Sequence, residues 1–306
     1  MPDGPEPNRT PVRIIIPFAL LWALAGLGAP RASAHGFAGE RFFPPTLQTD
    51  DPFAADELAL PTISFFKTGP ETRETDINYD FSKLIVPRFG LEVSQDFIEQ
   101  QPEGAPSVGG FDDLSIGAKY EIAISAAHEA IVSAGAEWDI GGTGAKRLGA
   151  DSTSTVTPTL YFGKGFGDLP GALTFLRPLA VTGLLGVTAP ARGGPTEDLP
   201  WGFAIEYSLP YLQSFVKDVG LRAPLKNLIP VVEFAFDTPL HQDGAATTGT
   251  INPGVLWEAR TVQIGAEAII PANRQSGSGV GLVFQVHFFI DDLLPGVFGH
   301  PIWGKG

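Results

Sequence analysis

The clearest pattern in the sequence is a strict alternation of polar and apolar residues from Asp113 to Ile124. Odd-numbered positions carry charged, polar or small residues, whereas even-numbered positions carry Leu, Ile, Ala and Tyr. A period of two predicts an extended strand rather than a helix. An ordinary strand has about 5–6 residues, whereas a tilted strand that crosses a bilayer needs about 9–11. One apolar face and one charged face favour a wall between lipid and a wet lumen.

Similar alternating stretches recur along the chain, and we expect twelve strands. They cover residues 58–68, 76–86, 88–97, 110–124, 128–140, 154–164, 173–188, 201–209, 228–238, 250–258, 261–270 and 279–290. An even number is what single-chain bacterial barrels require. The predicted fold class is therefore all-β, an antiparallel up-and-down transmembrane β-barrel of about twelve strands, with ten or fourteen as alternatives.

The connections between these strands alternate in length. Long stretches rich in Gly, Pro or polar residues occur at 99–110, 141–153, 190–200 and 239–249, and tight turns at 125–127 and 259–260. Outer-membrane barrels have short periplasmic turns and longer outer loops, so we expect both termini in the periplasm. The connection 211–227 is long for an inner turn, and its near-helical spacing predicts a short helix. Aromatic residues near strand ends could form interface girdles; they are Trp138, Trp201, Tyr207, Tyr211 and Trp257.

The first 34 residues have the pattern of an export signal. Arg9 and Arg13 precede an apolar run at 14–27, and residues 32–34 read Ala-Ser-Ala. Such a run is too short to span a membrane comfortably and is typical of a cleaved signal peptide. We expect residues 35–57 to be a lead-in that lies in the periplasm or in the lumen, residues 58–290 to form the barrel, and residues 291–306 to be a tail. The expected location is the bacterial outer membrane.

Composition narrows the function classes. The net charge is −14, which argues against a nucleic-acid partner. The chain has no cysteine, so disulfides, Cys-based metal sites and a Cys nucleophile are excluded. There is no G-x-S-x-G elbow, and His128 and Glu129 are adjacent, so a strand would turn them to opposite faces. We therefore expect no enzyme activity and no cofactor.

The polar face of the predicted wall is strongly acidic. The candidate lumen-lining residues are Arg88, Glu92, Asp113, Lys119, Glu121, Glu137, Glu206, Glu233, Glu258 and Glu267. Rings of carboxylates in a pore favour cations. Two interpretations remain open. One is a lumen that favours cations or neutral polar solutes, and the other is a polar plug in which the acids pair with the few bases and with Tyr and Thr hydroxyls.

His35 is a candidate metal ligand. Cleavage after Ala34 would make it the N-terminal residue, and its amine and imidazole could then bind copper together. The alternative is a histidine that merely follows the cleavage site, since no second histidine is close in sequence.

Two segments resemble a known family. They are GGFDDLSIGAKYEI at 109–122 and GKGFGDLPGALTFLRPLAVTGLLG at 163–186, and the lead-in from His35 also fits. They resemble the outer-membrane transporter family named after the meta pathway of phenol degradation. The resemblance implies a channel for passive uptake of small solutes, aromatic or hydrophobic compounds among them. The expected partners are outer-membrane lipid and a small solute, and the sequence does not specify an oligomeric state.

The tail from 291 to 306 departs from the usual pattern. Many outer-membrane barrels end on an aromatic residue at the close of the last strand, whereas here Phe288 and Phe289 are followed by a further segment. This leaves a soluble exported β-sandwich that binds a ligand as an alternative, because its apolar faces could pack on each other.

Overall fold

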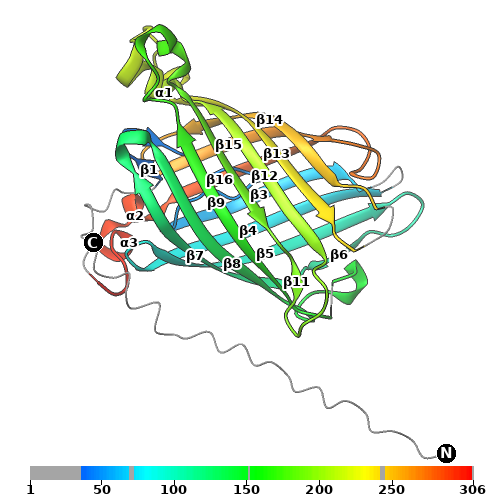
Figure 1. Ribbon diagram of the computed structural model, residues 1–306. Helices are drawn as coiled ribbons and strands as arrows, with labels where there is room; N and C mark the ends of the chain where they lie inside the picture. Colours follow the sequence, from blue (N-terminus) through cyan, green and yellow to red (C-terminus); the bar gives the residue numbers. More distant parts are fainter. Residues whose placement is uncertain (1–35, 69–71, 151, 242–244, 305–306) are drawn as a thin grey trace, which may run out of the picture. The chain divides into compact units, whose positions relative to one another are not determined.

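The computed structural model describes residues 36–68, 72–150, 152–241 and 245–304. Within these ranges twelve strands form one closed antiparallel barrel (Figure 1). They are β3 (Glu57–Lys67), β4 (Thr72–Val86), β5 (Phe89–Pro102), β7 (Leu114–Ser125), β8 (Ala130–Ile140), β9 (Thr155–Gly165), β10 (Leu179–Gly186), β12 (Asp198–Tyr207), β13 (Leu228–Pro239), β14 (Thr248–Glu258), β15 (Val262–Pro271) and β16 (Gly281–Phe289). The ring closes where β16 pairs with β3 and where β9 pairs with β10.

The predicted fold class is confirmed. Each strand of the ring pairs with two neighbours, which removes the free edges that an open sheet would expose. The alternative of a β-sandwich is wrong, because the strands form a single sheet closed on itself rather than two sheets packed face to face.

Ten of the twelve expected strands agree with the structure to within five residues at each end. The fourth is interrupted at residues 112–113, which divide it into β6 (Val108–Phe111) and β7, both paired with β5. A short β11 (Ala189–Pro190) continues the line of β10 along β9.

The seventh expected strand begins too early. Gly171–Leu176 is the 3₁₀ helix η4, and β10 starts only at Leu179. Pro170 and Pro178 flank this stretch, and proline has no N–H to donate to a sheet ladder. The carbonyl group of Arg177 accepts a hydrogen bond from the side chain of Arg41, and that of Pro178 accepts from Arg41 and from the Ser208 amide, both at 3.0 Å.

The outward face of the barrel is apolar. Large hydrophobic side chains are exposed on nearly every strand of the ring, including Phe65, Tyr79, Leu91, Ile122, Trp138, Leu160, Leu185, Ile205, Val255, Ile264 and Leu282. On β12 and β13, Phe203 and Phe234 stack at 4.5 Å between ring centroids. An apolar surface of this extent is far larger than the patches on soluble monomers and suits contact with lipid.

No helix among the described residues is long and apolar enough to cross a membrane.

We call the end of the barrel at which β3 begins and β16 ends the proximal end, and the opposite one the distal end. Proximal turns at 87–88, 126–129 and 259–261 are tight, whereas the connections 166–178 and 208–227 are long. The expected short helix is present as α1 (Leu209–Tyr211), which runs into η5 (Leu212–Val216), and η6 (Leu225–Asn227) precedes β13. The expectation for Tyr211 is wrong, because its side chain is buried beside the lead-in rather than exposed in a girdle.

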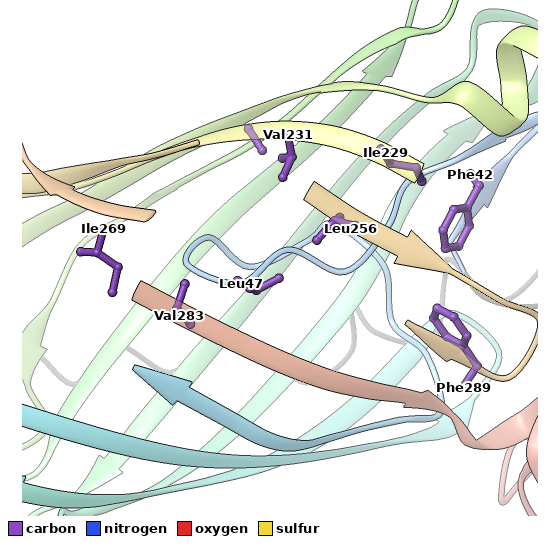
Figure 2. Close-up of a cluster of buried hydrophobic side chains, with 9 residues drawn as sticks. Phe42, Leu47, Ile229, Val231, Leu256, Ile269, Val283 and Phe289 are labelled. Carbon is purple, nitrogen blue, oxygen red and sulfur yellow. The ribbon is translucent and has the colours of Figure 1, made fainter. Parts of the chain in front are cut away.

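The core lies inside the barrel, between the wall and a segment of residues 36–56 that we call the lead-in. The lead-in opens with a small hairpin of β1 (Phe37–Ala38) and β2 (Arg41–Phe42) and then continues into the lumen without regular structure. Figure 2 shows Phe42 and Leu47 of this segment among inward residues of the strands. That group contains Ala204, Ile229, Val231, Leu256, Ile269, Val283 and Phe289. A second group joins Phe43 and Phe53 of the lead-in to Ile131 and Ala180.

The tail folds back onto the proximal end of β4. After α2 (Ile290–Leu293) and α3 (Pro295–Phe298), the amide of Ile302 donates to the carbonyl of Leu84 at 3.1 Å, and that of Trp303 to Ile85 at 2.9 Å. These bonds give the segment beyond the last strand a fixed place, so its presence is compatible with a closed barrel.

Candidate functional site

One carboxylate of the wall holds the middle of the lead-in. Glu233 on β13 is fully buried. Its Oε1 accepts from the amide of Leu47 at 2.6 Å, and its Oε2 accepts from the amides of Gln48 at 3.0 Å and Thr49 at 2.6 Å. The Thr49 hydroxyl also donates to Oε2 at 2.7 Å. Hydrogen bonds to an ionised acceptor are about twice as strong as neutral ones, so this contact fixes the segment firmly.

Backbone carbonyl groups of the lead-in are bound on other sides of the ring. Gln263 Nε2 on β15 donates to the carbonyl of Pro45 at 2.7 Å. Ser133 Oγ on β8 donates to the carbonyl of Pro52 at 2.5 Å. Since β15 and β8 are separated by several strands in either direction round the barrel, the lead-in crosses the lumen rather than following one side of it.

Charged residues of β7 and β4 hold the second half of the lead-in. Lys119 Nζ lies 2.7 Å from Asp50 Oδ1 and donates to the carbonyl of Asp51, also at 2.7 Å. Glu121 Oε1 accepts from the amide of Ala54 at 3.1 Å. Asp56 pairs with Lys83 near the proximal end. Burial raises the pKa of Asp56, against the opposing effect of Lys83.

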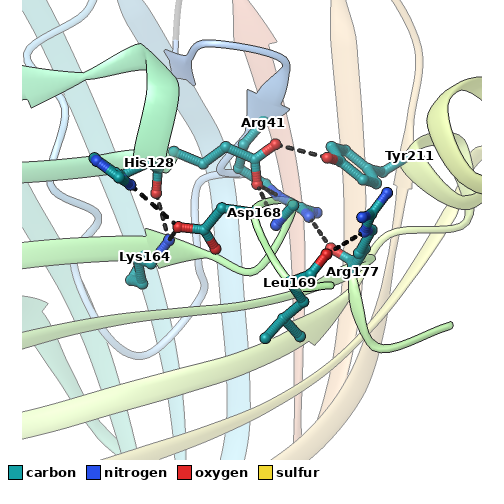
Figure 3. Close-up of polar contacts among 9 residues, drawn as sticks. Arg41, His128, Lys164, Asp168, Leu169, Arg177 and Tyr211 are labelled. Atoms are coloured by element: carbon teal, nitrogen blue, oxygen red, sulfur yellow. Dashed lines mark hydrogen bonds and ion pairs between the residues drawn. The ribbon is translucent and has the colours of Figure 1, made fainter. Parts of the chain in front are cut away.

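A buried ion pair anchors the start of the lead-in at the proximal end (Figure 3). Arg41 is fully buried, and its Nε lies 3.3 Å from Glu129 Oε2. The guanidinium carbon lies 3.8 Å from the centre of the Tyr211 ring. The Tyr211 hydroxyl donates to Glu129 Oε1 at 2.7 Å, and the Gly167 amide donates to Oε2 at 2.9 Å. Burial, together with the bond to Glu129, raises the pKa of Tyr211 to about 12.

The lead-in does not fill the lumen completely. A cavity of about 430 Å³ opens on its distal side and is lined by Phe66, Asp76, Asp80, Glu92, Asp96 and Gln285, among others. A second cavity of about 110 Å³ is lined by Asp50, Glu92, Lys119, Glu137, Tyr161 and His287, among others. Both include Asp50, Asp80, Glu92 and Gln285, so they adjoin along the wall of β4 and β5.

The structure distributes the sequence-predicted lumen residues over three settings. Glu92, Lys119 and Glu137 line the cavities. Glu121 and Glu233 bind the lead-in, as described above. Glu206 and Glu267 are buried in the lumen, and Glu258 is the last residue of β14 at the proximal end.

Two expected positions need correction. Arg88 lies in the turn between β4 and β5, with a positive φ of 70°, and not in a strand. Asp113 lies in the break between β6 and β7, where its Oδ1 accepts from the Gly144 amide at 2.7 Å and the Thr143 hydroxyl at 3.2 Å. The alternating pattern runs on through both residues, although the strand itself ends beside them.

Sequence reasoning missed Arg41 and Asp96. Arg41 belongs to the lead-in, which has no periodicity from which a contact could be predicted. Asp96 lies on β5 with the same phase as Glu92 and within the expected strand 88–97, so the alternation already placed it on the lumen face, although it was not among the candidate residues.

The histidines give no metal centre in the part of the chain that the structure describes. His35 lies outside the described residues, so its copper site remains a prediction. Among the described residues no group of three or more His, Cys, Asp or Glu side chains could hold a metal ion. His287 Nε2 lies 3.2 Å from Glu57 Oε2 in the lumen.

A second pair of a histidine and a carboxylate is exposed at the proximal end. His128 Nδ1 lies 3.3 Å from Asp168 Oδ2, and Lys164 Nζ lies 2.9 Å from the same oxygen (Figure 3). The hydrogen bond from Lys164 and, second, that from His128 hold the pKa of Asp168 below its usual range. Glu129 is bound to Arg41 and Tyr211, so it does not orient His128.

Comparison with solved structures shows which known fold the barrel resembles. The chain is similar to an outer-membrane channel from Pseudomonas putida F1, with a TM-score of 0.51 and 12% identity over 80% of this chain and 99% of that one. It also matches the KdgM porin, with a TM-score of 0.46 and 12% identity over 76% and 98% of the two chains. The NanC porin matches with a TM-score of 0.45 and 8% identity over 75% and 98%. No family model and no curated protein matches the sequence.

The chain therefore has the fold of a bacterial outer-membrane β-barrel. The likeness to the Pseudomonas putida F1 channel covers nearly all of that protein and shows this fold. The apolar belt on the outward face supplies the surface that such a barrel presents to lipid.

Proposed function

We propose that the protein is an outer-membrane channel for passive passage of small solutes, and that the lead-in limits conduction. The observation that carries this proposal is the pair of adjoining charged cavities inside a closed barrel with an apolar outer face. The fold likeness to the Pseudomonas putida F1 channel supports the same role. The proximal end, which holds both chain ends of the barrel, then faces the periplasm.

The charge of the cavities supports a preference for cations and neutral polar solutes. Asp76, Asp80, Glu92 and Asp96 line the larger cavity, which Lys67 reaches only from the exposed distal end of β3. Lys119, which lines the adjoining smaller cavity, is bound to the lead-in. Carboxylates that line a pore attract cations and repel anions. Glu233 accepts one hydrogen bond from a threonine hydroxyl, as the polar-plug interpretation expects. Its other bonds and that of Glu121 come from backbone amides of the lead-in, and neither carboxylate pairs with a base among the described residues.

Aromatic or hydrophobic solutes, which the family resemblance implies, form a narrower proposal. Phe66 and Ile269 give the distal cavity an apolar side, but carboxylate, amide and hydroxyl groups make up much of the rest. A ring that carries a polar or positively charged group suits this lining better than a pure hydrocarbon.

The test is single-channel conductance of refolded mature protein in a planar bilayer under a KCl gradient. We expect discrete steps with a reversal potential that shows cation preference. A variant that lacks residues 37–55 should conduct several-fold more, because the segment that crosses the lumen is gone. Folding of both proteins is checked by circular dichroism and by heat-modifiable mobility in detergent gels. Folded proteins that both give no current would contradict a channel, and a clear anion preference would contradict the acidic pathway.

A further inference from the structure

The acidic side of the distal cavity is built on two neighbouring strands. Asp76 and Asp80 lie on β4, and Glu92 and Asp96 lie on β5, all with their side chains on the lumen face. Asp96 pairs in register with Asn78, so it stands between the levels of Asp76 and Asp80. Neighbouring strands are about 4.8 Å apart, and alternate residues of one strand about 6.7 Å. A ligand that touches two or more of these carboxylates must therefore be several ångströms long.

These four carboxylates have no cation of their own in the described part of the chain. None of them forms an ion pair with a described residue, whereas Lys119 is 2.7 Å from Asp50 of the lead-in. Lys67 lines the same cavity only from the exposed distal end of β3. The described residues also contain no group that could hold a metal ion. The site thus gathers four carboxyl groups without the close convergence of ligands that a metal needs.

A second observation, independent of the charge, shows which groups the cavity lacks. Gln285 on β16 is only 6% exposed and lines both cavities. Its Nε2 donates to Thr62 Oγ1 at 3.0 Å, but its carbonyl oxygen Oε1 is buried without a hydrogen-bond partner among the described residues. Asp76 Oδ1 is also buried without a hydrogen-bond partner among the described residues. Buried acceptors without donors are costly, so a bound molecule that brings N–H groups would relieve them.

The chemistry of the missing partner follows from these two observations. An ammonium group has three donors and a guanidinium group has five, and neither has an acceptor. Each adds the positive charge that the carboxylates lack. The volume of about 430 Å³ is that of a small-molecule pocket. Phe66 lines it from β3, and an aromatic face attracts organic cations.

We propose that the distal cavity binds small organic cations that carry primary ammonium or guanidinium groups. Asp76, Asp80, Glu92 and Asp96 receive the charged groups, and the free oxygen of Gln285 accepts one N–H. The inference rests on the proposed channel function, since it names the class of solute that the pathway selects. The cavity lies on the distal side of the lead-in, so a cation that enters from the distal end binds there before it reaches the lead-in.

The test uses 1,4-diaminobutane as the probe, with 1,4-butanediol as the neutral analogue and succinate as the anionic one. Isothermal titration calorimetry of the full mature chain in detergent measures binding without any need for conduction. We expect the diamine to bind and the diol and succinate to give no measurable heat. The double variant Asp76→Asn/Asp96→Asn should bind the diamine at least tenfold more weakly. The matched control Glu103→Gln, which removes a charge from an exposed distal loop, should leave affinity unchanged.

Gln285→Glu supplies a gain of binding that misfolding cannot imitate. It replaces the unpaired carbonyl by a carboxylate and should tighten diamine binding several-fold. Equal binding of diamine and diol, or full affinity in the double variant, would overturn the inference. A protein that conducts cations but binds no diamine refutes this inference alone. One that binds the diamine but never conducts refutes the channel function alone.

Discussion

Glu233 is a buried carboxylate that is satisfied without a cation. It accepts three amide hydrogens and one hydroxyl hydrogen from residues 47–49, in a part of the lumen that side chains fill. A charged acceptor is worth about 1.5–3 kcal/mol for each hydrogen bond, so its contribution depends on the full charge. The lead-in therefore depends on this one side chain more than on any single apolar contact described here.

Glu233→Gln should loosen the middle of the lead-in while the barrel stays closed. The amide side chain has one acceptor oxygen, and its NH₂ group opposes the backbone N–H groups that the second carboxylate oxygen receives. A loss of about 2 kcal/mol corresponds to roughly thirtyfold faster exchange. Hydrogen exchange by mass spectrometry of peptides covering residues 45–52 measures this.

Glu137→Gln is the matched control, since Glu137 lines the smaller cavity and accepts no hydrogen bond from a described lead-in residue. Its exchange at residues 45–52 should equal that of the unchanged protein. Unaltered exchange in Glu233→Gln would show that apolar contacts alone hold the segment.

The sequence could place Glu233, Glu121 and Glu92 on the inner face. It could not predict which of them bind the lead-in and which line a cavity. Lipid on one side and polar lumen on the other impose a period of two, and that period is visible in the residues. Which carboxylate meets an amide depends on the route of residues 36–56, whose sequence has no period. The same gap explains why Arg41, fully buried and bound to Glu129, was not foreseen.

Strand β9 shows why the elements themselves were predictable. Leu160 and Phe162 face outward at 50% and 43% exposure, whereas Tyr161 between them faces the lumen at 8%. The outer face must be apolar at every second residue over the whole length of the strand, which leaves a strong signal. The start of β10 was missed because Leu173 and Phe175 continue the alternation into a 3₁₀ helix bounded by prolines.

Leu160→Arg should destabilise the barrel in lipid by about 2–4 kcal/mol, because it places a charge near the middle of a spanning strand. Equilibrium unfolding by guanidinium chloride in phospholipid vesicles measures the change. Leu160→Ile, which keeps the apolar volume, should cost less than about 1.5 kcal/mol. Equal stability of the arginine variant would mean that this face does not contact hydrocarbon.

The stability of the lead-in inside the lumen should depend on pH. Burial raises the pKa of Asp51 from near 3.8 to about 7, Glu57 and Asp50 act in the same direction, and Lys119 and the Phe53 amide oppose them. The pKa of this carboxyl group is higher when the lead-in occupies the lumen than when the lead-in has left it, so the occupied state binds the proton more tightly. The stabilisation of the lead-in inside the lumen is therefore complete below about pH 4 and is lost as pH rises towards 7.

Conductance of the intact protein should accordingly rise between pH 4 and pH 8. Asp51→Asn, which cannot ionise, should keep conductance nearly constant over this range. The variant lacking residues 37–55 serves as the reference for pH effects on the wall itself. A fall in conductance with rising pH, or the same rise in Asp51→Asn, would exclude this residue as the cause.

The Arg41 anchor also decides how the lumen can be cleared. The lead-in is fastened near one end by Arg41 and at the other by Asp56, which leads directly into β3. The lead-in is therefore anchored at both ends. A force applied to the N-terminal side of Arg41 acts first on the contacts of Arg41, and it reaches the Glu233 contact only after those have broken. While both anchors hold, the segment between them can only shift within the lumen, so the width of the open path is limited by the length of that segment and not by the diameter of the barrel.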